Sequence, residues 1–147
     1  MQAVRIEKMQ PAHAEAAAAI EKDLFGQPWS REGFLSSLAN PDAFYLAAFE
    51  EEKLVGYCGF FQSFDEAEIT NVAVAPSSQN KGIGRAMLKE LIGQGRERGV
   101  ERYILEVRVT NERAIHLYEK LGFLKMGVRR GFYEKPKEDA LIMCLNH

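Results

Sequence analysis

Residues 69–85 read ITNVAVAPSSQNKGIGR, and this stretch decides the fold. Its first part, residues 69–74, is rich in alternating β-branched residues, as a strand is, and Pro76 ends that strand. From Ile83 onward, apolar residues recur at four-residue spacing, which predicts an amphipathic helix. The two glycines of the stretch therefore lie where a strand passes into a helix.

A junction of this kind exposes backbone hydrogen-bond donors, because the first N–H groups of a helix have no partner inside it. Glycine lets a ligand approach these donors closely, so the main chain alone can bind phosphate oxygens. Lys81, Arg85 and Lys89 surround the helix start, where the helix dipole favours acids, and no Asp or Glu occurs from Ile69 to Lys89. A docked polyanion would explain these charges, but a solvated basic helix edge after an ordinary turn would also produce them.

Two common nucleotide-binding motifs do not match this turn. A Walker loop ends in Gly-Lys-Ser/Thr, whereas Gly84 is followed by Arg85 and Ala86. The dinucleotide pattern requires Gly or Ala where Met87 stands, and it normally follows the first strand of its domain. The turn is therefore predicted to bind an anion of another kind.

The composition is that of an ordinary soluble protein, with 46% apolar and 27% charged residues. A chain of 147 residues fits one domain, expected to span residues 1–147. The longest stretch without a charge, residues 69–80, is far shorter than the ~20 residues that span a bilayer. The first residues, MQAVRIEK, mix both charge signs, so neither a signal peptide nor a membrane segment is predicted and a cytoplasmic location is expected.

Cysteine, histidine and net charge bear on other classes of site. Cys58 and Cys144 each lie in an apolar run, which predicts reduced, buried thiols. His13, His116 and His147 have no Cys or His neighbour at ligand spacing, so no metal site is predicted. A formal charge of −2 disfavours nonspecific binding to nucleic acid. Nothing in the sequence indicates an oligomeric state.

The order of elements predicts an α/β fold with one mixed sheet and no internal repeat. Strands are expected at residues 4–9, 43–50, 53–64, 66–74, 103–109, 123–133 and 140–145. Helices are expected at residues 11–23, 30–38, 83–98 and 111–121, with a loop over residues 25–29 between the first two.

Two side chains after the turn carry chemistry. Glu106 lies in the strand 103–109, on the face that also carries Ile104 and Arg108. It is either half of a solvated Glu-Arg pair or, because its strand follows the anion-binding helix, a base in a cleft. Tyr118 lies seven residues after the predicted N-cap Asn111, on the same side of the helix, and is either core or a ligand contact.

These segments resemble the Gcn5-related N-acetyltransferase (GNAT) superfamily, and within it the RimI-type enzymes that acetylate the N-terminal alanine of a small-subunit ribosomal protein. The resemblance extends from Val4 to Leu145. For the superfamily it depends on residues 71–74 and 79–84, and for the subgroup on residues 28–30, 105–108, 111, 114–115, 117–118 and 121–123. It implies a GNAT-like, mainly antiparallel single sheet of about seven strands flanked by about four helices.

The resemblance implies acetyl-coenzyme A (acetyl-CoA) as co-substrate, with its pyrophosphate on the amides of the turn and its pantetheine arm along the preceding strand. The implied cofactor-binding residues are Val72, Ala73, Val74, Gln79, Asn80, Lys81, Gly82, Ile83, Gly84, Arg85 and Asn111. Glu106 is implied as general base, directly or through water, and Tyr118 as the acid that protonates the departing thiolate. No metal is needed.

The implied acceptor is a protein N-terminal α-amine, the alanine of a ribosomal protein. Trp29, Phe132 and Tyr133 are candidates for the acceptor opening. Two positions depart from the family pattern: Ser78 stands where an aromatic residue is common, and Phe132 replaces the first of two usual tyrosines. Two alternatives stay open, a GNAT enzyme for lysine or a small amine and a non-catalytic regulatory module that binds coenzyme A.

Overall fold

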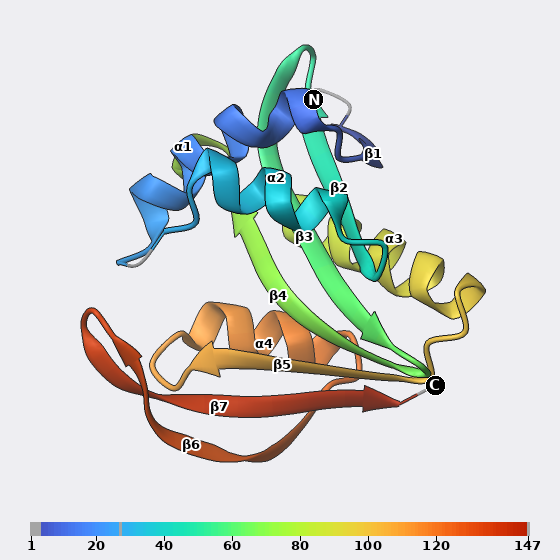
Figure 1. Cartoon of the computed structure of the whole chain (residues 1–147). Helices are drawn as coiled ribbons and strands as arrows, with labels where there is room; N and C mark the ends of the chain where they lie inside the picture. The colour runs from blue at the N-terminus through green and yellow to red at the C-terminus, as the bar shows by residue number, and fades with distance from the viewer. Residues whose placement is uncertain (1–3, 27, 147) are drawn as a thin grey trace.

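Within the described residues, 4–26 and 28–146, the computed structural model arranges seven strands in one sheet (Figure 1). Their order is β1-β2-β3-β4-β5-β7-β6, and all neighbours are antiparallel except the parallel pair β4 and β5. The strands are β1 (Val4–Lys8), β2 (Ala43–Glu50), β3 (Lys53–Ser63), β4 (Glu66–Val74), β5 (Arg102–Arg108), β6 (Leu124–Glu134) and β7 (Lys137–Asn146). The helices are α1 (Ala14–Leu24), α2 (Arg31–Ala39), α3 (Ile83–Glu97) and α4 (Glu112–Lys120), with 3-10 turns η1 (Pro11–His13) and η2 (Pro76–Ser78).

The expected α/β fold, with a mainly antiparallel seven-stranded sheet and four helices, is confirmed for these residues. The α-helix expected from Pro11 begins instead at Ala14, because residues 11–13 form a 3-10 turn in which the His13 ring accepts the Gln10 N–H. Strand β7 begins at Lys137 rather than at residue 140, because its pairing with β6 continues to the turn.

Some expectations lie outside the described residues, namely those on residues 1–3, on Gln27 in the loop 25–29 and on His147. The single domain over residues 1–147 stays a prediction. Among the described residues, no helix is long and apolar enough to cross a membrane.

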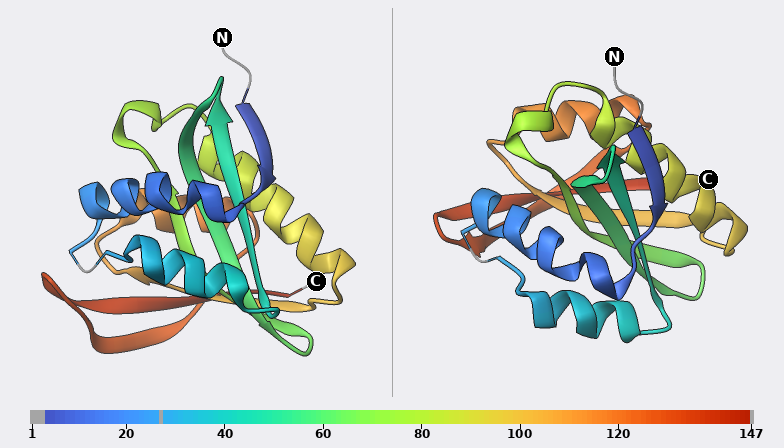
Figure 2. Two further views of the ribbon diagram at one scale, coloured as in Figure 1. Left: turned by 45° about the horizontal axis from the view of Figure 1, so that its top comes forward. Right: turned by 90° about the horizontal axis from the view of Figure 1, so that it is seen from above.

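Helices cover both faces of the strands β2, β3 and β4 (Figure 2). Helices α1 and α2 pack on one face, over a core that includes Phe34, Tyr45 and Tyr57. Helices α3 and α4 pack on the other, over a core that includes Met87 and Leu105. Strands β2 and β3 are buried along most of their length because both of their faces are covered. The expectation of free, buried thiols at Cys58 and Cys144 is confirmed.

The parallel pair β4 and β5 separates halfway along its length (Figure 1). Pairing runs only from Glu66 opposite Arg102 to Ile69 opposite Leu105. Beyond that point β4 pairs only with β3, and β5 pairs only with β7. The backbone of β4 from residue 70 to residue 74 therefore has an edge that faces β5 without being paired to it.

A bulge in β4 changes which face its side chains occupy. Asn71 lies opposite Gly59 and Ile69 lies opposite Phe60, so Thr70 has no partner residue in β3. Ile69 packs in the core beneath α3, whereas Ala73 packs in the core beneath α1. Without the extra residue, side chains two and four positions apart would have stayed on one face. The bulge thus turns Asn71 toward α1, at the point where β4 and β5 separate.

Candidate active site

A cleft of about 510 Å³ lies where β4 and β5 separate. One wall is the end of β4, and the others are the start of α3 and the inward side of α4. Its lining includes Leu24, Phe25, Val72, Ala73, Val74, Ser78, Gln79, Asn80, Gly82, Ile83, Gly84, Arg85, Asn111, Arg113, Ala114, Leu117 and Tyr118. The sequence-predicted cofactor residues are therefore brought together in one cleft, with the exception of Lys81.

The start of α3 presents uncapped backbone amides to this cleft. No side chain caps the helix, and the first helical carbonyl, that of Gly82, accepts from Ala86 N, which leaves the amides of residues 83–85 without an acceptor in the helix. Asn80 and Gly82 have φ angles of 66° and 81°, and backbone that enters the left-handed region in this way forms an anion-binding concavity. A Cβ added to Gly82 would meet nothing within 4 Å. The turn therefore has the open, donor-lined shape expected of a phosphate site.

The side chains of Lys81 and Ser78 hold this turn in place through contacts with Glu50. The Lys81 ammonium pairs at 3.4 Å with Glu50, the last residue of β2. The buried Ser78 hydroxyl donates to the same carboxylate at 2.6 Å, and this bond is the main reason that the pKa of Glu50 is lowered. The departure from the aromatic family pattern at Ser78 thus fastens the turn to β2.

A second cavity, of about 400 Å³, adjoins the first on the β5 side. It is lined by Glu21, Phe25, Gly26, Trp29, Ile69, Thr70, Asn71, Val72, Leu105, Glu106, Val107, Arg108, Asn111, Tyr118, Phe132 and Tyr133. All three predicted acceptor-binding residues and the predicted base are thus in one cavity. Four residues line both spaces: Phe25, Val72, Asn111 and Tyr118. The two cavities therefore meet beside Tyr118.

Glu106 is half-buried, and its arginine partner is not the one that the sequence suggested. Its carboxylate accepts a bond from Arg129 on β6 at 2.9 Å, whereas the neighbouring Arg108 pairs with Glu138. Register explains the difference, because Glu106 and Arg129 lie on either side of β7 on the same sheet face. Burial raises the pKa of Glu106, and the positive charge of Arg129 opposes part of that rise.

Tyr118 is buried on α4, in the apolar core and at the border of both cavities. Its ring packs against Phe123 at a centroid distance of 5.8 Å. Its hydroxyl makes no hydrogen bond to any described residue, and burial raises its pKa above the ordinary phenol value. A protonated hydroxyl with no hydrogen-bond partner among the described residues is therefore held at the junction. Asn111, the predicted N-cap, accepts from Ala114 N and lies at the same junction.

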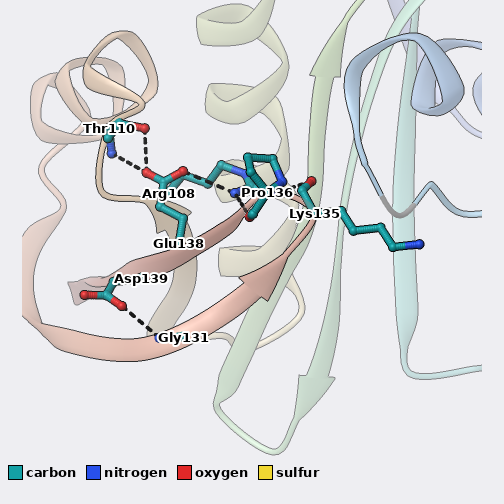
Figure 3. Close-up of polar contacts among 7 residues, drawn as sticks. All are labelled: Arg108, Thr110, Gly131, Lys135, Pro136, Glu138 and Asp139. Atoms are coloured by element: carbon teal, nitrogen blue, oxygen red, sulfur yellow. Dashed lines mark hydrogen bonds and ion pairs between the residues drawn. The ribbon is translucent and has the colours of Figure 1, made fainter.

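The hairpin of β6 and β7 lines the second cavity with Phe132 and Tyr133. Figure 3 shows the polar contacts that hold the tip of this hairpin. The Arg108 guanidinium donates to the carbonyls of Lys135 and Pro136 at 3.1 and 2.8 Å, and its charge lies 4.2 Å from the Tyr133 ring centre. Glu138 accepts from Arg108 and from both the amide and hydroxyl of Thr110. These bonds tie the hairpin tip to the end of β5, and with it the Tyr133 wall of the cavity.

Several lining residues were not found from the sequence. Phe25 and Arg113 line the first cleft, but nothing in their spacing marks them. Arg129 lies 23 residues from Glu106, so only the sheet register brings the two together. Glu21 is a charged residue at a buried position of the alanine-rich helix α1. A carboxylate on the buried face of a helix is unusual, so the helical pattern of the sequence could have indicated this residue. Within the described residues, no group of three His, Cys, Asp or Glu side chains is placed to hold a metal ion.

The model of the acetyltransferase (GNAT) family matches residues 14–123. The chain belongs to this family. Among its relatives, the ribosomal protein bS18-alanine N-acetyltransferase of Escherichia coli (strain K12) is 38% identical over 144 residues, which are 95% of each chain. The N-alpha-acetyltransferase RimI of Mycobacterium tuberculosis is 36% identical over 146 residues, which are 95% of this chain and 90% of the relative.

A solved structure of this family has the same fold. The crystal structure of the ribosomal-protein-S18-alanine N-acetyltransferase from Escherichia coli superimposes with a TM-score of 0.90 at 35% identity, over 98% of this chain and 94% of that one. The resemblance to the RimI-type members of the GNAT family is therefore confirmed, and with it the enzyme class of N-acetyltransferase.

Proposed function

We propose that the chain transfers an acetyl group from acetyl-CoA to the α-amine of a protein N-terminus, and that the acceptor is the N-terminal alanine of ribosomal protein bS18. The observation that carries this proposal is the meeting of two cavities at Tyr118, with the Glu106 carboxylate in only one of them. An acyl donor and an amine acceptor can thus enter from different sides and meet between an acid and a base. The activities named for relatives at 36 and 38% identity support the choice of acceptor.

The first cleft fits acetyl-CoA by its donors and its shape. The amides of residues 83–85 and the left-handed turn before them would hold the pyrophosphate, with Arg85 and Arg113 beside it. The unpaired edge of β4 at residues 72–74 would hold the pantetheine arm through main-chain hydrogen bonds. When bound, acetyl-CoA supplies the acetyl group as a reactive thioester. Asn111 would contact it at the junction.

The pKa values of the two kinds of amine favour an α-amine over a lysine side chain as the acceptor in the second cavity. An α-amine has a pKa of about 7.8 and lysine about 10.4, a difference of roughly 3.5 kcal/mol in the cost of deprotonation near neutral pH. Burial raises the pKa of Glu106, and this carboxylate is better matched to the α-amine, which is the weaker base of the two amines. Trp29, Phe132 and Tyr133 would surround the first residue of the acceptor.

In the proposed chemistry, the acceptor nitrogen forms a bond to the acetyl carbon as the carbon–sulfur bond breaks. Glu106 takes the proton from that nitrogen, directly or through one water molecule. Tyr118 gives its hydroxyl proton to the departing sulfur, a role that its raised pKa permits because the hydroxyl stays protonated near neutral pH. A cytoplasmic location stays a prediction.

Acceptor choice can be tested by offering acetyl-CoA with peptides that begin with Ala, Ser or Met, a peptide with an internal lysine and a blocked terminus, and spermidine. We expect the acetyl group on the α-nitrogen of the Ala peptide, located by tandem mass spectrometry. Transfer to lysine or spermidine alone would replace this proposal by the small-amine alternative. Saturable binding of acetyl-CoA with no transfer to any acceptor would favour a regulatory module.

A further inference from the structure

Glu21 of α1 is a buried carboxylate in the wall of the second cavity, and the chemistry proposed above does not use it. The residue is 3% exposed. Its Oε1 accepts from the Tyr57 hydroxyl at 2.8 Å and from Asn71 Nδ2 at 3.0 Å. Its Oε2 accepts from the backbone amide of Trp29 at 3.1 Å.

The three groups that donate to Glu21 are all neutral. Their dipoles stabilise the negative charge of the carboxylate, but no positive charge in the described part of the chain neutralises it. Among the described residues, no Lys, Arg or His lies within 4.0 Å of this carboxylate. Such an arrangement is costly, since a buried charge without a counter-charge loses several kcal/mol of hydration. Glu21 acts on its hydrogen-bonded neighbour, because after burial its charge is the next cause that raises the pKa of Tyr57. Glu106 differs, because Arg129 faces it.

These hydrogen bonds leave the Glu21 carboxylate able to accept one more. A carboxylate accepts about four hydrogen bonds, and three are made here. The Asn71 amide is fixed in orientation, because its Oδ1 accepts from Tyr45 while its Nδ2 donates to Glu21. The bulge at Thr70, whose hydroxyl also bonds Tyr45, places this amide. If these hydrogen bonds served only to hold the fold together, a neutral polar side chain could accept them in place of the carboxylate.

We propose that Glu21 is a specificity-determining residue that draws the acceptor into the second cavity as an α-ammonium ion. The negative charge favours a cationic N-terminus over a neutral one. Glu106 then takes one proton to free the nitrogen lone pair and passes it to solvent, and it takes the second proton as the nitrogen bonds to the acetyl carbon. Glu21 selects and positions the acceptor, and it takes no part in bond making. This inference rests on the proposed function, because it assigns the ligand of the same cavity.

The test compares binding of two peptides of one sequence, one beginning with Ala and one with a propionyl group, which lacks only the amine. Binding is measured by calorimetry with coenzyme A present, for the wild type, Glu21→Gln and Tyr57→Phe. We expect the wild type to prefer the amine by about tenfold or more, as one charge acting over several ångströms at an effective dielectric constant near 20 requires. Glu21→Gln should bind both peptides alike, whereas Tyr57→Phe, which removes one hydrogen bond and keeps the charge, should retain the preference.

Retained amine preference in Glu21→Gln, or its loss in Tyr57→Phe, overturns the inference. If Glu21→Gln does not fold, as judged by circular dichroism and coenzyme A affinity, Glu106→Gln decides. That variant removes the other carboxylate, and we expect it to keep most of the amine preference. Loss of the preference there would assign the selection to Glu106. Failure of the wild type to acetylate any α-amine would refute the proposed function instead, whatever Glu21 does.

Discussion

Replacement of Arg129 by Gln should move the titration of Glu106 to higher pH. Burial already raises the pKa of this carboxyl, and the Arg129 charge and hydrogen bond at 2.9 Å hold it down. Without the guanidinium, the protonated form persists to higher pH, so the carboxylate that we propose as the base forms only at higher pH. The sign is fixed, because removing a cation always disfavours the ionised form of a neighbouring acid.

The size of this shift follows from the exposure of the pair. The Arg129 side chain is 57% exposed and that of Glu106 is 15% exposed, so solvent screens much of the attraction. Exposed pairs are worth about 0.2–1 kcal/mol, which at 1.36 kcal/mol per pH unit corresponds to at most about 0.7 of a unit. We therefore expect a rise of about half a pH unit at low salt. It should shrink in 1 M NaCl, where the Debye length is about 3 Å.

The assay is a carbon-13 NMR titration of the glutamate carboxyls, in which Glu106→Gln identifies the resonance of Glu106. The acid limb of the pH profile of kcat/KM should move by the same amount, because that profile reports groups of the free enzyme. Arg130→Gln is the matched control, since it removes an exposed charge from the next position of β6. A titration midpoint that stays in place, or moves to lower pH, in Arg129→Gln would show that this ion pair does not set the acidity of Glu106.

Other predictions follow from the same geometry. Glu106→Gln should lower kcat by about 10² or more, because the proposed base is lost, while calorimetry should show unchanged acetyl-CoA affinity. The melting temperature of this variant at pH 7 should not fall. The pKa of Glu106 is raised in the folded protein, so its ionisation opposes folding at pH values above its unfolded pKa. Tyr118→Phe should lower kcat by a similar factor while the KM for acetyl-CoA holds, and an unaltered kcat would exclude it as the acid. Gly26→Ala should raise the KM for the acceptor but not the KM for acetyl-CoA, because the new Cβ would lie 2.0 Å from the Lys135 carbonyl oxygen at the hairpin tip. Gly93→Ala is the control, since a Cβ there would have nothing within 4 Å. Equal steady-state constants for the two variants would count against this prediction.

The sequence was sufficient for elements whose signals are local. The β-branched run before Pro76 and the four-residue spacing after Ile83 predicted β4, the turn and α3 together. Asn111 was predicted as an N-cap from its own chemistry, and the structure confirms the bond to Ala114 N. Such features depend on residues within one turn or strand, where propensity and period are informative.

Features that depend on register or packing between distant segments could not be predicted. The partner of Glu106 was expected within its own strand, but Arg129 reaches it across β7. The bulge at Thr70 leaves no mark in a strand that otherwise alternates, yet it decides which face carries Asn71. The carboxylate of Glu21 joins Tyr57 and Asn71, which are 36 and 50 residues away, so its place in the cavity depends on the completed fold.

Two cavities meet beside Tyr118, with Glu106 in the second, and we propose that the first takes the acyl donor and the second an N-terminal amine. A crystal structure with coenzyme A joined through an acetyl bridge to the α-nitrogen of an Ala-initiated peptide tests this directly. We predict that the pyrophosphate lies on the amides of residues 83–85, that the peptide leaves through the cavity of Trp29 and Tyr133, and that the bridged nitrogen lies within direct or one-water reach of Glu106. A peptide that leaves by another path, or a Glu106 carboxylate beyond that reach, would contradict the account.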